Sequence, residues 1–368
     1  MAPGSAKLYS VGYLMLVSFA LDSIFGIPND RMEALKYSPY DGIAVIYAGA
    51  YQHAELDHAA LARQFKQAAA RTGKQVWPWI FLNRICGYVE ENSIKVNDPG
   101  KQYFARIKGL DVFGDQGELD AFMDLWTGAL RAAKASGAPG IVFDPELYNN
   151  YENAKVSALA EQMGRSEDDV KANLKDLGAR LADLAAKEYP NAVIISLFSG
   201  LAEQPFDYSI HDFDYRSYTY LFIGFLDRCN RKRYALTLVS GGEIELGYCH
   251  KNLAAMRKRI AVQGEKNQPI LARYPALKEG APLCPWANAD GKTKWLLTAY
   301  ACKNSQAASA EDFLPYFQEL LHAFPYVWVY GATASDYNPG AINTAAWKRV
   351  NNVLWKAKGQ KPPRPPKP

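Results

Sequence analysis

Two acidic side chains stand two residues apart at the end of a short apolar run, in the segment Gly140-Ile-Val-Phe-Asp-Pro-Glu-Leu-Tyr148. If this run is a β-strand, its side chains alternate between two faces, so Asp144 and Glu146 share one face and Phe143 takes the other. Pro145 donates no backbone hydrogen bond and therefore suits the end of a strand. Two carboxylates held together in a partly dry cleft repel each other, which raises one pKa and leaves an acid able to protonate a leaving group. The segment predicts glycosidic-bond cleavage with Glu146 as general acid/base.

A glycosidase with two carboxylates needs a second acid, about 5 Å from the first for retention of configuration and farther for inversion. The segment Val239-Ser-Gly-Gly-Glu243-Ile-Glu245 follows another predicted strand, and its two glycines permit a sharp turn or the close approach of a ligand. We predict Glu243, or Asp144 itself, as the second catalytic carboxylate, with Glu245 and Asp336 in reserve. The structural alternative makes Asp144 a helix cap and places Glu146 in an ion pair with a nearby Lys or Arg.

Aromatic side chains recur at every second position of two further runs, from Trp77 to Phe81 and from Tyr326 to Tyr330. Sugar rings stack on aromatic faces, and Asn and Arg bind hydroxyl groups in a fixed geometry. We expect the deeper aromatic residues to fill the core, and Trp79, Asn83 and Tyr330 to lie open near the carboxyl end. The predicted substrate contacts are Trp79, Asn83, Arg84, Tyr148, Glu245, Tyr300, Trp328, Tyr330 and Asp336.

Short apolar runs alternate with segments of helical period along the whole chain, which is the pattern of repeated βα units. Apolar residues recur at three- and four-residue steps between Leu119 and Ala133 and between Val170 and Leu184, as on the buried face of a helix. We expect eight strands, at Gly12–Phe19, Gly42–Ala48, Gln75–Phe81, Gly140–Asp144, Ala192–Phe198, Tyr234–Val239, Lys294–Tyr300 and Tyr326–Tyr330.

Eight such units predict an α/β fold of the (β/α)8, or TIM-barrel, type. The sequence has no Gly-x-Gly-x-x-Gly motif, so the nucleotide signature of an open doubly wound sheet is missing and no cofactor is predicted. A barrel needs about 250 residues, and the chain has 368, so we expect long loops at the carboxyl ends of the strands, where barrel active sites lie. We predict one catalytic domain over residues 8–358 and a disordered Pro- and Lys-rich tail over 359–368.

The charge is nearly balanced, with 42 basic and 38 acidic residues, so neither nucleic acid nor a membrane surface is predicted as a partner. The five cysteines show no Cys-x-x-Cys pair and no zinc-finger spacing, so no metal site is expected. The apolar run Val11 to Ala20 has features of a secretory signal, but removing it would leave seven strands, so we assign it to the first strand. We lean towards a secreted or periplasmic protein whose native signal is missing from this chain.

The segment Phe143-Asp144-Pro145-Glu146-x-Tyr148 resembles the fourth strand of (β/α)8 glycoside hydrolases. It is similar in part to the chitinase-type families, which end this strand in Asp-x-Glu, and that resemblance implies that Glu146 is the general acid and Asp144 orients an acetamido group. Val142 stands where the fuller chitinase pattern carries a further acid. The Glu-x-Tyr portion also resembles the endo-mannosidase-type barrels.

The sequence therefore predicts a barrel that cleaves a poly- or oligosaccharide. Two alternatives remain open. One is a glycan-binding barrel without activity. The other is a polysaccharide lyase, which would abstract a proton with Tyr or His and leave an unsaturated product.

Overall fold

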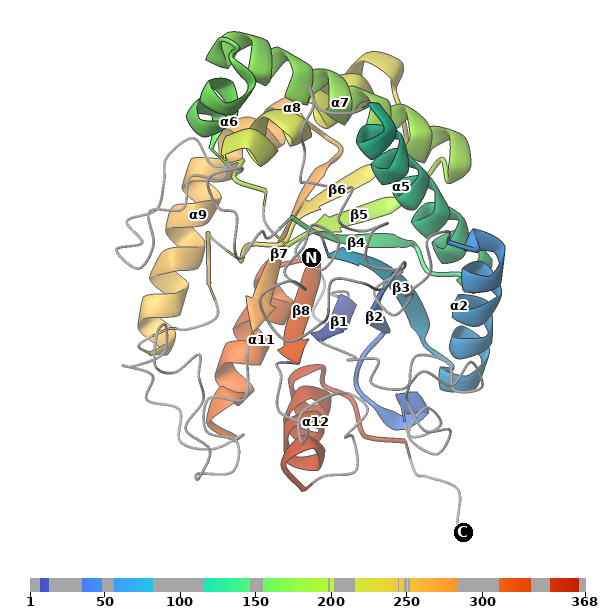
Figure 1. Ribbon diagram of the computed structural model, residues 1–368. Coiled ribbons are helices and arrows are strands. Elements are labelled where there is room, and N and C mark those ends of the chain that lie inside the picture. Colours follow the sequence, from blue (N-terminus) through green and yellow to red (C-terminus); the bar gives the residue numbers. More distant parts are fainter. Residues whose placement is uncertain are drawn as a thin grey trace, which may run out of the picture.

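Eight parallel strands pair in chain order and close into a barrel in the computed structural model (Figure 1). The strands are β1 Lys7–Gly12, β2 Gly42–Ile46, β3 Gln75–Phe81, β4 Gly140–Asp144, β5 Val193–Ser196, β6 Thr237–Ser240, β7 Leu277–Leu283 and β8 Tyr326–Gly331. The structure describes residues 7–12, 35–47, 56–81, 116–145, 155–197, 199–201, 216–243, 245–247, 250, 252–283, 311–331 and 345–363.

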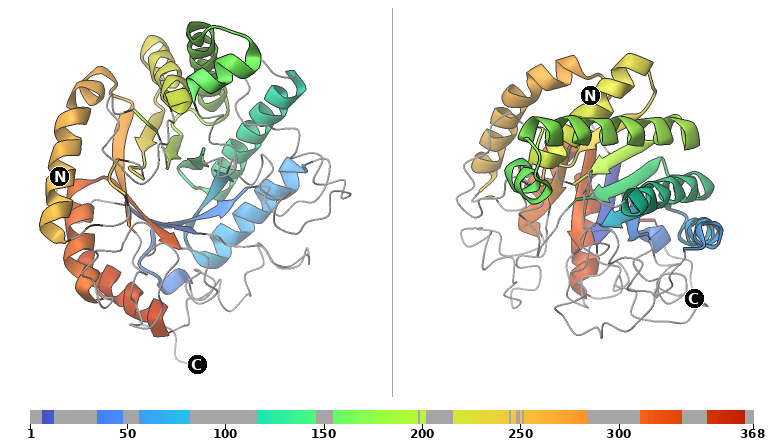
Figure 2. Two further views of the ribbon diagram at one scale, coloured as in Figure 1. Left: turned by 60° about the vertical axis from the view of Figure 1, so that its left-hand side comes forward. Right: turned by 45° about the horizontal axis from the view of Figure 1, so that its top comes forward.

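Helices lie around the outside of the strands, as both views in Figure 2 show. The helices are α2 His58–Thr72, α5 Gln116–Ser136, α6 Val156–Met163, α7 Glu167–Glu188, α8 Arg216–Lys232, α9 Leu253–Arg273, α11 Leu314–Ala323 and α12 Ala345–Ala357, with short 3-10 turns at Leu35–Tyr37 and Glu311–Phe313. Helix and strand alternate along the described chain, so the predicted α/β barrel is confirmed.

The predicted apolar stripes are the buried faces of two helices. Phe122, Trp126 and Leu130 of α5 are buried, and so are Val170 and Leu174 of α7. A periodicity of 3.6 residues was sufficient here because each helix packs against apolar neighbours, α5 against β3 and β4 and α7 against α8.

The direction of side chains along β4 follows from its aromatic contacts. The ring of Phe143 lies 5.6 Å from that of Trp126 on α5 and 6.1 Å from that of Phe222 on α8, so Phe143 points outward to the helices. Strand alternation then turns Val142 and Asp144 towards the barrel interior.

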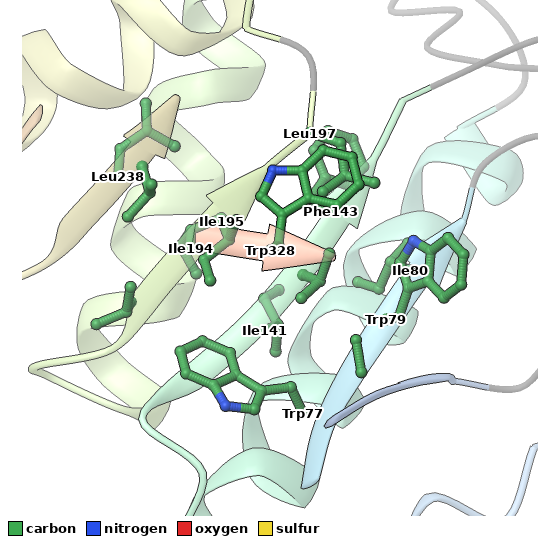
Figure 3. Close-up of a cluster of buried hydrophobic side chains, with 14 of the residues drawn as sticks. Trp77, Trp79, Ile80, Ile141, Phe143, Ile194, Ile195, Leu197, Leu238 and Trp328 are labelled. Carbon is green, nitrogen blue, oxygen red and sulfur yellow. The ribbon is translucent and has the colours of Figure 1, made fainter. Parts of the chain in front are cut away.

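Tryptophans fill the interior of this barrel. Trp79 pairs in register with Val142 and therefore points inward with it. Figure 3 shows Trp77 and Trp79 of β3 and Trp328 of β8 among the buried side chains of β4 and β5. Large side chains inside lie beside small residues on the neighbouring strands: Ala44 is the register partner of Trp77, and Gly280 is that of Tyr326.

Two of the predicted strands are placed differently in the structure. The first strand is Lys7–Gly12, whereas we expected Gly12–Phe19, of which residues 13–19 lie outside the described part. The seventh strand is Leu277–Leu283, so the assignment of that position to Lys294–Tyr300 was wrong. The sequence Leu-Lys-Glu-Gly-Ala-Pro-Leu lacks an apolar run because its outward face carries Glu279, which is bonded to polar side chains of α9.

Candidate active site

Asp144 ends β4 inside the barrel. Its side chain is 2% exposed, and its register partner on β3 is Phe81. The inward direction predicted from alternation is therefore found, and it places a carboxyl group at the carboxyl end of a barrel strand, where barrel enzymes carry their chemistry. Pro145 follows directly and is buried. Glu146 and Tyr148 lie outside the described residues, so their predicted roles stay predictions.

The Gly241-Gly242 pair forms the sharp turn that the sequence predicted after β6. Gly242 has a φ of 78°, and a Cβ there would lie 2.7 Å from the carbonyl oxygen of Gly280 on β7. A Cβ on Gly241 would lie 2.6 Å from the carbonyl oxygen of Ser196 on β5. Only glycine fits both positions, because the chain turns between two strands at backbone contact distance.

Glu243 follows this turn and is half-buried, with its backbone N–H donating to the carbonyl of Leu197 at 3.2 Å. The bond fixes the position of Glu243 just beyond the end of β5. Asp144 and Glu243 thus follow the carboxyl ends of β4 and β6, with β5 between them.

Trp328 supports the same turn from inside the barrel. Its indole N–H donates to the carbonyl of Gly241 at 2.8 Å, and its side chain is 1% exposed. Trp79 is also 1% exposed, which differs from our expectation that it lies open near the carboxyl end. Both indoles pack in the core of the described structure, because the rings on β3 and β8 must fill the space that small residues on other strands leave. Stacking of a sugar on either ring stays a prediction.

Glu245 lies away from the barrel interior. It is 2% exposed and accepts hydrogen bonds from the Ser199 hydroxyl at 3.3 Å and from the backbone N–H of Gly200. Burial, more than any other effect, raises the pKa of its carboxyl group, and the charge of Glu279 adds to the rise. Since Glu279 faces α9, Glu245 belongs to the layer between sheet and helices, and the described contacts do not bring it to Asp144.

The remaining predicted contacts fall outside what the structure describes. They are Asn83, Arg84, Tyr300 and Asp336, together with the side chain of Tyr330, whose backbone belongs to β8. Tyr300 was assigned to the seventh strand, and the correction of β7 places it in the segment that follows this strand instead.

Sequence reasoning missed a polar chain on the outer side of β2. The Tyr47 hydroxyl lies 2.7 Å from His58 Nδ1, and His58 Nε2 lies 2.8 Å from Asp124 Oδ2 on α5. Gly128 of α5 lies against these two rings, and a larger residue would not fit because its Cβ would lie 2.7 Å from the Tyr47 hydroxyl. Tyr47 is buried, whereas the side chain of Asp124 is 58% exposed, so the chain connects β2, α2 and α5 and reaches solvent at Asp124. The sequence feature that could have indicated this chain of hydrogen bonds is Gly128, which interrupts an otherwise regular apolar stripe.

Among the described residues, no group of three His, Cys, Asp or Glu side chains is arranged to hold a metal ion. None of the helices in the described ranges is long and apolar enough to span a membrane. Cys229 is a free, buried thiol, and burial raises its pKa to about 12, which makes it unreactive as a nucleophile.

Solved structures share this fold over nearly the whole chain. An endo-beta-mannanase/endo-beta-glucanase of Prevotella bryantii aligns with a TM-score of 0.54 and 10% identity, over 97% of this chain and 49% of that one, so this chain spans about half its length. A glycoside hydrolase family 5 enzyme from Prevotella bryantii B14 aligns with a TM-score of 0.50 and 11% identity over 97% of both chains. A D-allulose 3-epimerase from Methylomonas sp. aligns with a TM-score of 0.45 and 14% identity over 98% of both.

The first two likenesses show an α/β-barrel fold. No protein-family model matches the sequence, and no curated protein is similar to it. At such low identity these likenesses show the fold alone, because one barrel architecture carries many activities. The activity must therefore be argued from the residues of this chain.

Proposed function

We propose that this chain is a glycoside hydrolase that cleaves a poly- or oligosaccharide by carboxylate acid/base catalysis. The observation that supports it most is the buried, inward carboxyl group of Asp144 at the carboxyl end of β4, two residues before Glu146. Barrel enzymes carry their catalytic groups at the carboxyl ends of the strands, which is where this carboxyl group lies. The likeness of the fold to two carbohydrate-cleaving barrels agrees with the proposal.

The roles follow from position and burial. Glu146 is the general acid/base, because it follows Asp144 beyond the rigid strand and the proline. Asp144 is almost inaccessible to solvent, so it is suited to orient Glu146 or the reacting sugar and to stabilise charge, and poorly suited to activate water. Glu243 is half-buried on a turn fixed by backbone contacts, and it is the better candidate for the second catalytic carboxylate.

The substrate is a carbohydrate in this proposal, and the side chains that line its path come from the loops after the strands. Asn83, Arg84, Tyr148, Tyr300 and Asp336 follow barrel strands in the chain, and Tyr330 belongs to β8. The loops after the strands build the face of a barrel on which its active site lies, which supports these residues as substrate contacts. Trp79 and Trp328 are buried in the barrel interior, so their proposed role is to shape the floor of the site.

A panel of glycans with detection of reducing ends tests the proposal. Glu146→Gln is expected to lower kcat by at least about 100-fold, and Asp144→Asn and Glu243→Gln are expected to lower it as well, with the thermal midpoint nearly unchanged. Glu265→Gln is the matched control, because Glu265 is exposed on α9 and far from the proposed site in the chain. Equal activity of Glu146→Gln and the control would overturn the assignment.

The same panel separates the alternatives. Binding of a glycan without any product indicates a non-catalytic barrel. A product that absorbs in the ultraviolet indicates a lyase, and interconversion of free monosaccharides without bond cleavage indicates an isomerase or epimerase. Each of these outcomes contradicts the proposed hydrolase.

A further inference from the structure

A buried cluster of oxygen atoms lies between α9 and the strands β6 and β7, outside the proposed active site. Glu279 of β7 accepts hydrogen bonds at one carboxyl oxygen from Asn267 at 2.7 Å and from Gln263 at 3.4 Å, both on α9. Glu245, in the turn after β6, interacts electrostatically with Glu279. Within the part of the chain that the structure describes, neither carboxyl group forms an ion pair, so two acids share a buried region without a basic partner.

Several polar atoms of this cluster have no hydrogen-bond partner among the described residues. They are Glu245 Oε2, Gln263 Oε1 and Asn267 Oδ1, and their side chains are 2%, 0% and 6% exposed. An unsatisfied buried polar group is expensive, and native proteins rarely leave one unless an ion or a water molecule satisfies it. All three atoms are oxygens, which points to a cation.

The two amides hold Glu279 in place and keep their oxygens available. Gln263 and Asn267 each donate one N–H to Glu279 Oε1, at 3.4 and 2.7 Å, and their side-chain oxygens have no partner among the described residues. An amide oxygen is a ligand that Ca²⁺ takes beside carboxylates.

We propose that Glu245, Glu279, Gln263 and Asn267 form a binding site for a hard divalent cation, and that Ca²⁺ is its best match. Two carboxylates would neutralise a divalent charge, and carboxylate and amide oxygens are the ligands that Ca²⁺ takes in flexible sets of six to eight. Mg²⁺ fits less well, since it demands near-ideal octahedral geometry and retains water. The ion would tie α9 to the turn after β6.

Bases in the neighbourhood do not replace the cation. Arg259 of α9 donates to the carbonyl of Leu246 at 2.9 Å. Burial, and then the charge of Arg259, lowers the pKa of His250 to about 4, so this imidazole is neutral at pH 7. Neither group offers a positive charge to Glu245 or Glu279 through a salt bridge in the described structure.

Thermal unfolding at pH 7.5 tests the site, with the protein treated with EDTA and then supplied with excess Ca²⁺ or Mg²⁺. Saturating Ca²⁺ is expected to raise the midpoint by about 4 °C, Mg²⁺ by less, and Glu279→Gln is expected to abolish the rise. Glu265→Gln on the exposed face of α9 is the control and should keep it. Isothermal titration should give one Ca²⁺ per chain in the wild type and none in Glu279→Gln.

A gain-of-charge variant gives a result that a plain acidic cluster cannot produce. Asn267→Asp adds a third buried carboxyl group, so it should unfold below the wild type in EDTA but show a larger rise on addition of Ca²⁺. A fully protonated, ion-free cluster predicts instead that Ca²⁺ has no effect on either protein. Unchanged midpoints together with no calorimetric signal would overturn the site, and this result leaves the proposed hydrolase untouched.

Discussion

Trp328 on β8 donates its indole N–H to the backbone carbonyl of Gly241 after β6, at 2.8 Å. The bond crosses the barrel interior past β7 and holds the turn that leads to Glu243. The packing of the core and the position of Glu243, a predicted catalytic carboxylate, therefore both depend on Trp328.

Trp328→Phe is expected to lower the free energy of unfolding by about 1–3 kcal/mol, because a buried carbonyl loses its donor. It should also lower kcat through displacement of the turn before Glu243. Trp355→Phe is the matched control, since the Trp355 indole donates to the Tyr37 carbonyl at 3.3 Å, away from the site. Urea unfolding and steady-state kinetics measure both effects, and equal kinetic losses in the two variants would contradict a positioning role.

Two helical glycines should respond to alanine with opposite sign. A Cβ at Gly128 would clash with His58 Nδ1 and lie 2.7 Å from the Tyr47 hydroxyl, so Gly128→Ala should destabilise the protein by about 1–3 kcal/mol. A Cβ at Gly264 on α9 meets nothing within 4 Å, so Gly264→Ala should stabilise it by about 0.5–1 kcal/mol. Urea unfolding of both variants checks the pair, and a shift in the same direction would refute the packing argument.

His250 should make the protein sensitive to acid. Burial lowers its pKa to about 4 from an ordinary value of 6.5, so the folded state binds fewer protons than the unfolded state between these values. The stabilisation is complete above pH 6.5 and is lost as the pH falls towards 4. Replacing His250 by Gln should therefore reduce the stability lost between pH 7.5 and 4.5 by about 2 kcal/mol. An unchanged difference between the two pH values would show that His250 does not titrate in this way.

Lys358 is the last residue of the predicted domain, and it binds the segment that precedes β2 at the amino-terminal side of the barrel. Its ammonium group donates to the Pro39 carbonyl at 2.9 Å and to Asp41 Oδ2 at 3.1 Å, and its side chain is 9% exposed. Lys358→Met should cost about 1–3 kcal/mol, whereas deletion of residues 360–368 should leave the thermal midpoint unchanged. A marked loss of stability on that deletion would show that the tail belongs to the domain.

Periodicity predicted most of the fold, and failed where side chains of one strand depend on another element. The stripes of α5 and α7 and the alternation of β4 were readable because the residues that each element buries are mostly apolar. Strand β7 was not readable, since Glu279 faces amides on α9 and Gly280 leaves room beside Tyr326. Those partners are distant in the sequence, so the local pattern of apolar and polar residues does not indicate them.

For the candidate site, the sequence predicted the direction of the side chains better than it predicted how deeply they are buried. Alternation correctly turned Asp144 inward, and the glycine pair correctly marked the turn before Glu243. The burial of Trp79 and the position of Glu245 between the sheet and the helices were not predictable, because both depend on how the eight strands close into a barrel. How deeply an aromatic ring is buried depends on the side chains that the other strands place in the barrel interior, and not on the sequence of its own strand.

Turnover by Glu146→Gln on a glycan that the wild type cleaves tests whether Glu146 is the general acid/base. If it is, kcat falls by at least about 100-fold, with circular dichroism and the thermal midpoint unchanged and the Glu265→Gln control fully active. Wild-type turnover by Glu146→Gln would contradict this role.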